Sequence, residues 1–232
     1  MEKELEELLD RLREISEKGY IPTRRKGNTG VGMTLEAELG IAENNRGSAD
    51  WKGIIELKAQ REDTPSKITL FTKSPRRIVS MKWADIVLKY GYQDQNGRWA
   101  IYRTFSTQRS VEGWRLRTQQ GQLILSYEET DIGAWNLDDL FDVLRKKLQG
   151  TVFVFAKTRK IDNIEHFHYH RYMIGERIRK NRFLRMLEKG EIVVDFRMYV
   201  REDGTCRDHG TAFRIAAGKI PDLFDETTEN RL

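Results

Sequence analysis

The sequence predicts a mixed α/β protein with a largely antiparallel sheet. Apolar residues recur with the 3.6-residue period of helices in some segments and with the two-residue period of strands in others. These segments follow one another without the strict strand–helix alternation of a doubly wound parallel fold. The chain has 232 residues, of which 38% are hydrophobic and 33% are charged. This length fits one large domain, or one domain with an inserted lobe, and the composition supports a sizeable core rather than a disordered chain.

The first segment predicts an amphipathic helix that ends at Gly19, because glycine is a natural stop for a helix. Its apolar face is formed by residues at helical spacing: Leu5, Leu8, Leu9, Leu12 and Ile15. Residues 23–32 follow as a polar, basic and glycine-rich stretch, which excludes a regular strand or a long helix. A short helix is expected next, with Leu35 and Leu39 one turn apart and Gly40 at its end.

The remaining elements are predicted from periodic apolar runs that are bounded by turn residues. The clearest helix covers residues 136–148, where Asn136 can cap the first turn. The dipeptide Asn96-Gly97 predicts a turn. An antiparallel meander is then expected from three runs: residues 98–105, 113–118 and 122–127. The other helices are expected at residues 80–90 and 175–189, a loop at 41–51, and the other strands at 53–59, 67–73, 151–157, 164–172, 191–200 and 211–215.

Charge and cysteine content limit the class of protein. Lysine and arginine number 41 against 36 aspartate and glutamate residues, and the net charge of +5 permits a polyanionic partner. Cys206 is the single cysteine, which excludes an internal disulfide framework and a cysteine-rich zinc site. No apolar run approaches the length of a membrane span, and residues 1–7 lack the apolar core of a signal peptide. We therefore expect a soluble, cytoplasmic protein without a membrane partner.

The sharpest chemical feature is the segment Asp50-Trp-Lys-Gly-Ile-Ile-Glu56-Leu-Lys58. Side chains two residues apart on a strand point to the same face, so Glu56 and Lys58 project together, and Asp50 can fold back toward Glu56. Two neighbouring carboxylates repel each other unless a cation lies between them, and Mg²⁺ prefers a few carboxylates together with water and a phosphate oxygen. With a lysine beside the ion, this set of groups is what phosphodiester hydrolysis needs.

Spacing alone favours a more ordinary explanation, a solvated edge strand with a Glu–Lys pair, because the pattern is frequent in highly charged chains. Two observations favour the catalytic explanation instead. The residues around the pattern, 53–55 and Leu57, are mostly apolar, which indicates a core strand. Glu36 lies in the predicted short helix just upstream and can flank the same site.

Three polar or basic segments are candidates for nucleic-acid contact. In the glycine-rich stretch, backbone amides can approach phosphates beside several polar side chains. These are Arg24, Arg25, Lys26, Asn28 and Thr29. The glycine spacing matches neither a Walker loop nor a dinucleotide fingerprint, so we expect no nucleotide cofactor.

Lys73 and Ser74 begin a second basic turn, which suits phosphate contact. A polar segment after a predicted turn carries side chains that can read base edges. These are Arg207, Asp208, His209 and Arg214, of which Arg214 can also face the sheet. The ordinary alternatives are a flexible basic loop for residues 23–32 and a solvated hairpin tip for this polar segment.

His166, His168 and His170 alternate with Phe167 and Tyr169, which puts three imidazoles on one face of a strand. Such a row can hold zinc or nickel. A half-exposed sheet face opposite a buried one is the commoner explanation, and we expect it here.

Four blocks of the chain carry a family resemblance. They are Thr23-Arg-Arg-Lys-Gly-Asn-Thr-Gly-Val-Gly-Met-Thr-Leu-Glu36, then Asp50 with Glu56-Leu-Lys58, then Leu70-Phe-Thr-Lys-Ser-Pro75, and finally Asp208-His-Gly-Thr-Ala-Phe-Arg-Ile215. In this order they resemble the MvaI/BcnI family of type II restriction endonucleases, relatives of the mismatch-repair nicking enzyme MutH within the PD-(D/E)xK nucleases. The blocks span residues 23–215, and the overall length also matches.

The resemblance implies a MutH-like fold, with a central mixed sheet flanked by helices and two lobes around a DNA cleft. The catalytic lobe is expected to centre on about residues 1–75, and the DNA-recognition lobe to comprise the remainder, including residues 195–215. By position in the family pattern, Asp50 and Glu56 would be metal ligands, Lys58 the catalytic lysine and Glu36 an outlying acidic residue of the site. The sequence departs from the pattern at Ala49, where the family has proline, and residues 92–172 match no motif.

The implied activity is Mg²⁺-dependent hydrolysis of double-stranded DNA at a short pseudopalindromic CC-N-GG-like site, one strand at a time, by a monomer. A cognate DNA methyltransferase is expected genetically rather than as a bound partner. Two alternatives stay open: a MutH-like nicking repair endonuclease, and a non-catalytic DNA-binding protein. Adjacent carboxylates that repel phosphate argue against the second alternative.

Overall fold

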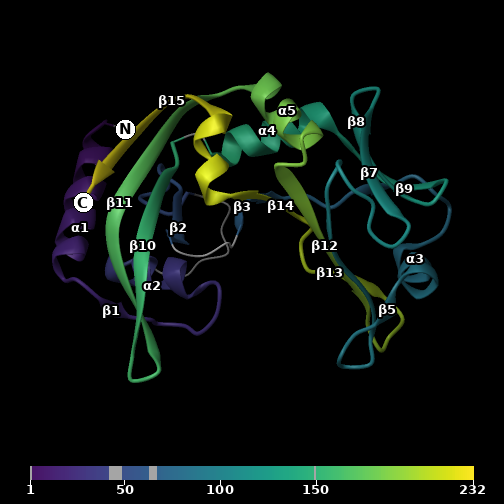
Figure 1. Ribbon diagram of the computed structural model, residues 1–232, viewed down its shortest axis with the longest axis horizontal. Helices are drawn as coiled ribbons and strands as arrows, with labels where there is room; N and C mark the ends of the chain where they lie inside the picture. The colour runs from purple at the N-terminus through teal and green to yellow at the C-terminus, as the bar shows by residue number, and fades with distance from the viewer. Residues whose placement is uncertain (1, 42–48, 63–66, 149) are drawn as a thin grey trace. The chain divides into compact units, whose positions relative to one another are not determined.

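The computed structural model describes residues 2–41, 49–62, 67–148 and 150–232. The chain divides into two compact units (Figure 1). The first unit comprises Met1–Ser66, Lys147–Ile178 and Ile220–Leu232, and the second comprises Lys67–Lys146 and Arg179–Lys219. Each unit is therefore built from segments that lie far apart in the sequence.

The described part of the first unit contains one five-stranded sheet. Four strands follow the order β1-β11-β10-β2, and β15 also pairs with β11. All pairings are antiparallel except that of β10 with β2, which is parallel. The strands are β1 (Ile21–Pro22), β2 (Leu57–Arg61), β10 (Val152–Ile161), β11 (Ile164–Ile178) and β15 (Phe224–Arg231), and the helices are α1 (Glu2–Glu17), α2 (Gly30–Glu38) and a 3-10 turn at Pro221–Leu223.

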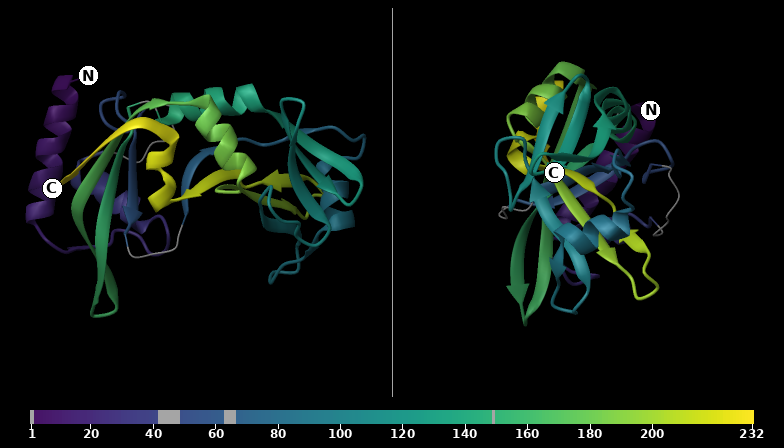
Figure 2. Two further views of the ribbon diagram at one scale, coloured as in Figure 1. Left: turned by 45° about the horizontal axis from the view of Figure 1, so that its top comes forward. Right: turned by 90° about the vertical axis from the view of Figure 1, so that its right-hand side faces the viewer.

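One hydrophobic core joins the helices of the first unit to its sheet. Helix α1 lies along β11 in the views of Figure 1 and Figure 2. Its buried apolar side chains are Leu8, Leu12 and Ile15, members of the predicted apolar face. They share a cluster with residues of α2 and of the sheet, among them Leu35 and Tyr169. Each fully buried leucine or isoleucine contributes about 1.5–3 kcal/mol relative to an exposed one, so this packing holds α1 and α2 on the sheet.

The described part of the second unit contains two sheets. The larger has the order β3-β14-β12-β6-β5, with β13 paired to β12, and the smaller has the order β4-β9-β8-β7. The strands are β3 (Lys67–Thr72), β4 (Arg76–Arg77), β5 (Tyr92–Gln93), β6 (Trp99–Phe105), β7 (Trp114–Gln119), β8 (Gln122–Tyr127), β9 (Thr130–Asn136), β12 (Ile192–Val200), β13 (Cys206–Asp208) and β14 (Ala212–Ala216). The helices are α3 (Trp83–Tyr90), α4 (Leu137–Leu148), α5 (Lys180–Glu188) and a 3-10 turn at Ala217–Lys219.

The mixed α/β class and the predicted cap of α4 are both confirmed. The side-chain oxygen Oδ1 of Asn136 accepts the backbone N–H groups of Asp138 at 2.8 Å and of Asp139 at 3.1 Å. These N–H groups have no partner inside the helix, so the cap stabilises the first turn by about 1 kcal/mol.

Two predicted strands differ from the structure. The strand expected at residues 53–59 begins only at Leu57, because the chain before it turns sharply. The run expected at 98–105 forms β6 (Trp99–Phe105), but β6 pairs with β12 and β5 instead of joining a meander. The meander consists of β7, β8 and the unpredicted β9. Alternation shows that a segment is a strand, and only long-range pairing decides which sheet it joins.

The helix expected at residues 175–189 starts later than predicted. Strand β11 continues to Ile178, and α5 begins at Lys180. The strand is prolonged because β15 pairs along it from Arg171 to Ile178. A β-carbon on Gly175 would lie 2.5 Å from the ring of Phe224, so glycine is required where these two strands meet. Of the loop expected at 41–51, residues 42–48 lie outside the described part.

Candidate active site

A tight turn in the first unit leads into β2. Lys52 and Gly53 in this turn have φ angles of 52° and 73°, and glycine adopts such angles without the steric cost of a β-carbon. Trp51 anchors the turn, since its side chain is 7% exposed and its indole N–H donates to the carbonyl of Glu4 in α1 at 3.2 Å. The turn folds Asp50 back onto the first residue of β2.

The acidic segment brings two carboxylates and an ammonium group to the start of β2. The Oδ2 atom of Asp50 accepts the backbone N–H of Leu57 at 2.9 Å. The Nζ atom of Lys58 donates to Oε1 of Glu56 at 3.3 Å, and these two side chains are 16% and 17% exposed. Because both groups are largely removed from solvent, their attraction is screened less than that of an open surface pair.

Parallel pairing with β10 holds the backbone that carries these groups. The carbonyl of Glu56 accepts the N–H of Val152 at 2.9 Å. Lys58 lies opposite Phe153, whose side chain is fully buried. The backbone of Glu56 and Lys58 is thus hydrogen-bonded to the buried strand β10. In the described part of the sheet β2 itself is the last strand in the order, so the expectation of a core strand is wrong in this respect.

Glu36 lies on α2, directly after the buried Leu35. Within the described ranges, no three histidine, cysteine, aspartate or glutamate side chains are arranged to hold a metal ion. Glu36 therefore does not form a three-carboxylate cluster with Asp50 and Glu56 in this structure. The pair of Asp50 and Glu56 remains the candidate for a metal site.

The chemistry of Asp50 and Glu56 fits a hard divalent cation such as Mg²⁺. Each carboxylate has one oxygen that accepts a hydrogen bond described above. The second oxygen, Oδ1 of Asp50 or Oε2 of Glu56, is a metal ligand of the type that Mg²⁺ prefers. One or two carboxylates together with water and substrate phosphate are the usual ligands of this ion. The residues present therefore fit the group that the family resemblance implies.

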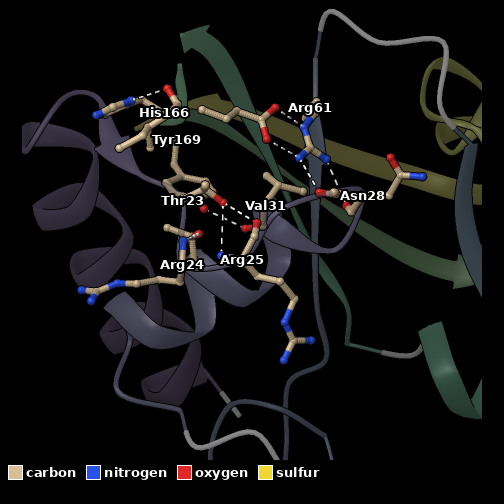
Figure 3. Close-up of polar contacts among 12 residues, drawn as sticks. Thr23, Arg24, Arg25, Asn28, Val31, Arg61, His166 and Tyr169 are labelled. Atoms are coloured by element: carbon tan, nitrogen blue, oxygen red, sulfur yellow. Dashed lines mark hydrogen bonds and ion pairs between the residues drawn. The ribbon is translucent and has the colours of Figure 1, made fainter. Parts of the chain in front are cut away.

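The basic glycine-rich loop, residues 23–29, precedes α2 in the same unit (Figure 3). The side chains of Arg24, Arg25, Lys26, Asn28 and Thr29 are all exposed. The guanidinium of Arg24 pairs with Glu38 at 3.1 Å, and Lys18 pairs with the same carboxylate at 2.9 Å. The hydrogen bond from Lys18, followed by that from Arg24, lowers the pKa of Glu38, although burial opposes this effect. The loop thus presents a cationic surface whose charge is only partly neutralised.

In the second unit, Asp208 organises the polar segment that includes His209. Its Oδ2 atom accepts the hydroxyls of Ser74 at 2.6 Å and Thr211 at 3.1 Å, and its Oδ1 atom accepts the N–H of Gly210 at 2.8 Å. The N–H of Lys73 donates to the carbonyl of Thr211 at 2.9 Å. The structure therefore brings Lys73 and Ser74 together with the segment 208–211, although they are distant in sequence.

His209 and Arg207 are exposed beside this cluster. The imidazole of His209 stacks on Tyr199, with ring centroids 5.1 Å apart and planes inclined by 25°. On Tyr199 there is also the guanidinium of Arg98, 4.4 Å from the ring centroid. The orientation of His209 is thus held by an aromatic ring that the sequence reasoning did not single out.

Arg214 is engaged inside the second unit. Its Nη1 atom donates to Oδ2 of Asp195 at 2.6 Å, and its Nη2 atom donates to the carbonyl of Lys67 at 2.6 Å. Asp195 is 5% exposed and also accepts the hydroxyl of Thr104. These bonds use two of the five N–H donors of the guanidinium, and the buried Nε atom has no hydrogen-bond partner in the described part of the chain.

The row of alternating histidines is half-exposed, opposite the fully buried Phe167 and Tyr169. His170 pairs with Glu62 at 2.7 Å. The pKa of His168 lies below its usual value because of burial and of the neighbouring His170 and Lys157 charges.

Cys206 is a free thiol, and burial raises its pKa to about 11. At neutral pH it is therefore protonated, which does not suit a nucleophile.

Sequence reasoning missed two residues that organise these surfaces. Arg61 lies on β2 three residues after Lys58 and binds the glycine-rich loop. Asp195 lies in a hydrophobic run of β12 and holds Arg214. A charged residue inside an apolar strand was the available signal for Asp195, whereas the partners of Arg61 lie more than 30 positions away.

Comparisons with known proteins identify the family and the fold of the chain. A model of the MvaI/BcnI restriction endonuclease family matches residues 9–224. A solved structure described as the restriction endonuclease MvaI–cognate DNA substrate complex has a TM-score of 0.80 and 25% identity, with 99% of each chain covered. The structure of restriction endonuclease MvaI in the absence of DNA has a TM-score of 0.56 and 23% identity, with 99% of this chain and 98% of that chain covered. The comparison with curated proteins returns no match.

Of the helices in the described part of the chain, none combines the length and the apolar character needed to cross a bilayer.

The family match covers nearly the entire chain, and the fold agrees with that of the MvaI structures. The chain therefore belongs to the MvaI/BcnI restriction endonuclease family, and it is a DNA endonuclease with the fold of that family.

Proposed function

We propose that this chain is a type II restriction endonuclease that hydrolyses both strands of a short pseudopalindromic site in double-stranded DNA. The expected target is CC-N-GG-like, the strands are cut one at a time, and the enzyme acts as a monomer with Mg²⁺. A cognate methyltransferase protects the host genome without being a bound partner. The observation that carries the catalytic part is the grouping of Asp50, Glu56 and Lys58 at the start of β2.

Each of these side chains has a distinct task in the proposed reaction. Asp50 and Glu56 would hold the metal ion through their carboxylate oxygens. When bound, Mg²⁺ supplies a Lewis acid that polarises the phosphodiester and makes a neighbouring water more acidic. Lys58 orients the attacking water and stabilises negative charge in the transition state, and Glu56 holds its ammonium in place at 3.3 Å. Glu36 on α2 is an outlying acidic residue of the site.

DNA contacts are divided between the two units. In the first unit, Arg24, Arg25, Lys26, Asn28 and Thr29 contact phosphates, which gives affinity without sequence information. Their exposure and the cationic character of the loop support this role.

In the second unit, Arg207, Asp208 and His209 read base edges, and Lys73 and Ser74 contact the backbone beside them. The contacts of Asp208 with Ser74 and of Lys73 with Thr211 support their joint role. Arg214 is a DNA-binding residue of the same surface, where Asp195 and the carbonyl of Lys67 hold its guanidinium.

The test is digestion of a phage genome and a supercoiled plasmid, with Mg²⁺ and with EDTA, alongside the variant Lys58→Ala. Discrete Mg²⁺-dependent fragments that are absent with the variant would support the proposal, and sequencing of their ends would identify the target. Open circles that never become linear would instead favour nicking in the manner of MutH. Binding without cleavage by the unaltered chain would contradict the catalytic assignment.

A further inference from the structure

Arg61 binds both the glycine-rich loop and the sheet of the first unit (Figure 3). Its Nη1 atom donates to the carbonyl of Asn28 at 3.0 Å, and its Nη2 atom donates to the carbonyl of Gly27 at 2.9 Å. On its other side, Nε and Nη2 donate to the two carboxylate oxygens of Glu165 at 2.8 and 2.7 Å. The guanidinium also lies over the ring of Phe167, 5.1 Å from its centroid. Four N–H groups of one side chain, which is 11% exposed, are thus engaged at once.

The loop is otherwise held mainly at its ends. Thr23 donates its hydroxyl to the carbonyl of Arg25 at 2.7 Å, and the backbone N–H of Arg24 donates to the hydroxyl of Thr34 at 2.9 Å. At the start of α2, a β-carbon on Gly30 would lie 2.3 Å from the carbonyl oxygen of Arg25, so the chain can turn here only at glycine. Between these points, the carbonyls of Gly27 and Asn28 accept N–H groups of Arg61, and the carbonyl of Gly27 also accepts the N–H of Gly30 at 3.1 Å.

The contact also orients the backbone amides of the loop. The described part of the chain has no cis peptide bond, and in a trans peptide the C=O and the following N–H point in opposite directions. When the carbonyls of Gly27 and Asn28 face Arg61, the N–H groups of Asn28 and Thr29 face away from it. The surface opposite Arg61 then carries amide donors together with the exposed side chains of the loop.

The same strand carries the catalytic lysine. Side chains alternate along a strand, so Lys58 and Arg61 project to opposite faces of β2. β2 therefore presents Lys58 to the active site on one face and holds the loop through Arg61 on the other. We propose that Arg61 is a positioning residue, which fixes the glycine-rich loop relative to the strand that carries Lys58. This inference rests on the proposed phosphate-binding function of the loop.

The principal test is Arg61→Lys, which keeps the charge. A lysine has one nitrogen and cannot serve both oxygens of Glu165 and two loop carbonyls together. The loop contains three trypsin sites, Arg24, Arg25 and Lys26, so its opening can be measured without DNA. We expect trypsin cleavage in the loop to become about tenfold to hundredfold faster, because hydrogen bonds from a charged donor are lost.

Binding of a fluorescein-labelled random-sequence DNA duplex, measured in EDTA over a salt series, gives the second readout. We expect Kd to rise about tenfold and the salt dependence to become shallower by about one phosphate contact. In cleavage assays the loss should fall mainly on KM rather than on kcat, since Lys58 is not altered.

Arg171→Lys is the matched control. Arg171 is in the same unit, pairs with Glu62 and Glu229, and lies 3.9 Å from the ring centroid of Phe155. The described contacts of Arg171 do not include the loop. The proposal would be overturned if trypsin cleaved the loop of Arg61→Lys no faster than that of Arg171→Lys.

Glu165→Gln provides a second variant in case Arg61→Lys does not fold. It keeps the shape of the side chain and removes the charge that orients the guanidinium, so loop cleavage should accelerate in the same direction but less. Unchanged trypsin cleavage of the loop in a folded Glu165→Gln protein would also overturn the proposed role of Arg61. If the unaltered chain fails to bind the duplex, the proposed phosphate contacts are wrong, while the trypsin assay still decides whether Arg61 orders the loop.

Discussion

Replacing Asp195 by asparagine should destabilise the second unit strongly, although the two side chains have the same shape. Asp195 is 5% exposed, and its carboxylate accepts hydrogen bonds from Arg214 at 2.6 Å, from Arg197 at 3.4 Å and from Thr104. The neutral amide leaves the guanidinium of Arg214, whose side chain is 24% exposed, without its opposite charge. Breaking a buried ion pair in this way typically costs about 3–5 kcal/mol. Because Arg214 keeps its bond to the carbonyl of Lys67, we expect about 3 kcal/mol, at the lower end.

Urea unfolding followed by tryptophan fluorescence measures this loss. Most of the signal arises from the second unit, because Trp83, Trp99, Trp114 and Trp135 lie within it and only Trp51 lies in the first. The control is Asp131→Asn, which breaks the exposed pair with Arg117 and should change the unfolding free energy by at most about 1 kcal/mol. A loss for Asp195→Asn no larger than that of the control would refute the reasoning.

The pH dependence supplies an independent check on Asp195. Burial alone would raise the pKa of this carboxyl, but the hydrogen bonds from Thr104 and Arg214 outweigh it and lower the pKa. A lowered pKa in the folded state adds stability that is complete above the unfolded value, about 3.9, and is lost as the pH falls through the folded value. The difference between the unaltered chain and Asp195→Asn should therefore persist from neutral pH down to about pH 4 and shrink below it. A difference that grows on acidification would contradict this assignment.

Three further changes test the active site, the reading segment and the core. Lys58→Ala should slow Mg²⁺-dependent plasmid cleavage at least about a hundredfold while retaining DNA binding, since it removes a transition-state group. The control is Lys52→Ala, in the turn before β2, which breaks only an exposed pair with Glu7 of α1 and should leave cleavage normal. Asp208→Ala removes the acceptor of Ser74, Gly210 and Thr211, so sequenced cleavage ends should show poorer discrimination between sites, and unchanged specificity would exclude Asp208 from base reading. Tyr169→Phe removes a buried hydroxyl that donates to the carbonyl of Val31 at 2.7 Å, and thermal or urea unfolding should show a loss of about 1–2 kcal/mol.

Local elements were largely predictable because each leaves a periodic or capping signature in the sequence. The leucines of α1 recur at helical spacing. Leu8 and Leu12 are buried, and Leu5 and Leu9 are partly buried against the same core. Asn136 caps α4 through its own neighbours, so no distant residue is needed to foresee the cap. β15 was not predicted, because its sequence Phe-Asp-Glu-Thr-Thr-Glu-Asn-Arg has no alternation of apolar residues, and it is a strand only because β11 offers it hydrogen-bond partners.

In the candidate site, too, local patterns were predictable and long-range contacts were not. The spacing of Asp50, Glu56 and Lys58 indicated their chemistry, and the basic composition of residues 23–29 indicated an anionic partner. The sequence contained no sign that Arg61 would hold that loop, since its partners are 33 and 34 positions earlier in the chain and 104 positions later. Likewise, the hydrogen bond between Ser74 and Asp208 joins residues 134 positions apart.

The sequence by itself determined the class of fold, the positions of most helices and strands, and the family, because these depend on local periodicity and on blocks of adjacent residues. Only the tertiary structure decided which strands pair, where β2 begins, and which side chains hold the loop and the reading segment. The physical reason is that a strand presents unpaired N–H and C=O groups along its edges, which any other strand can satisfy. The choice among partners, such as β10 for β2, depends on burial and hydrogen bonding summed over segments distant in sequence.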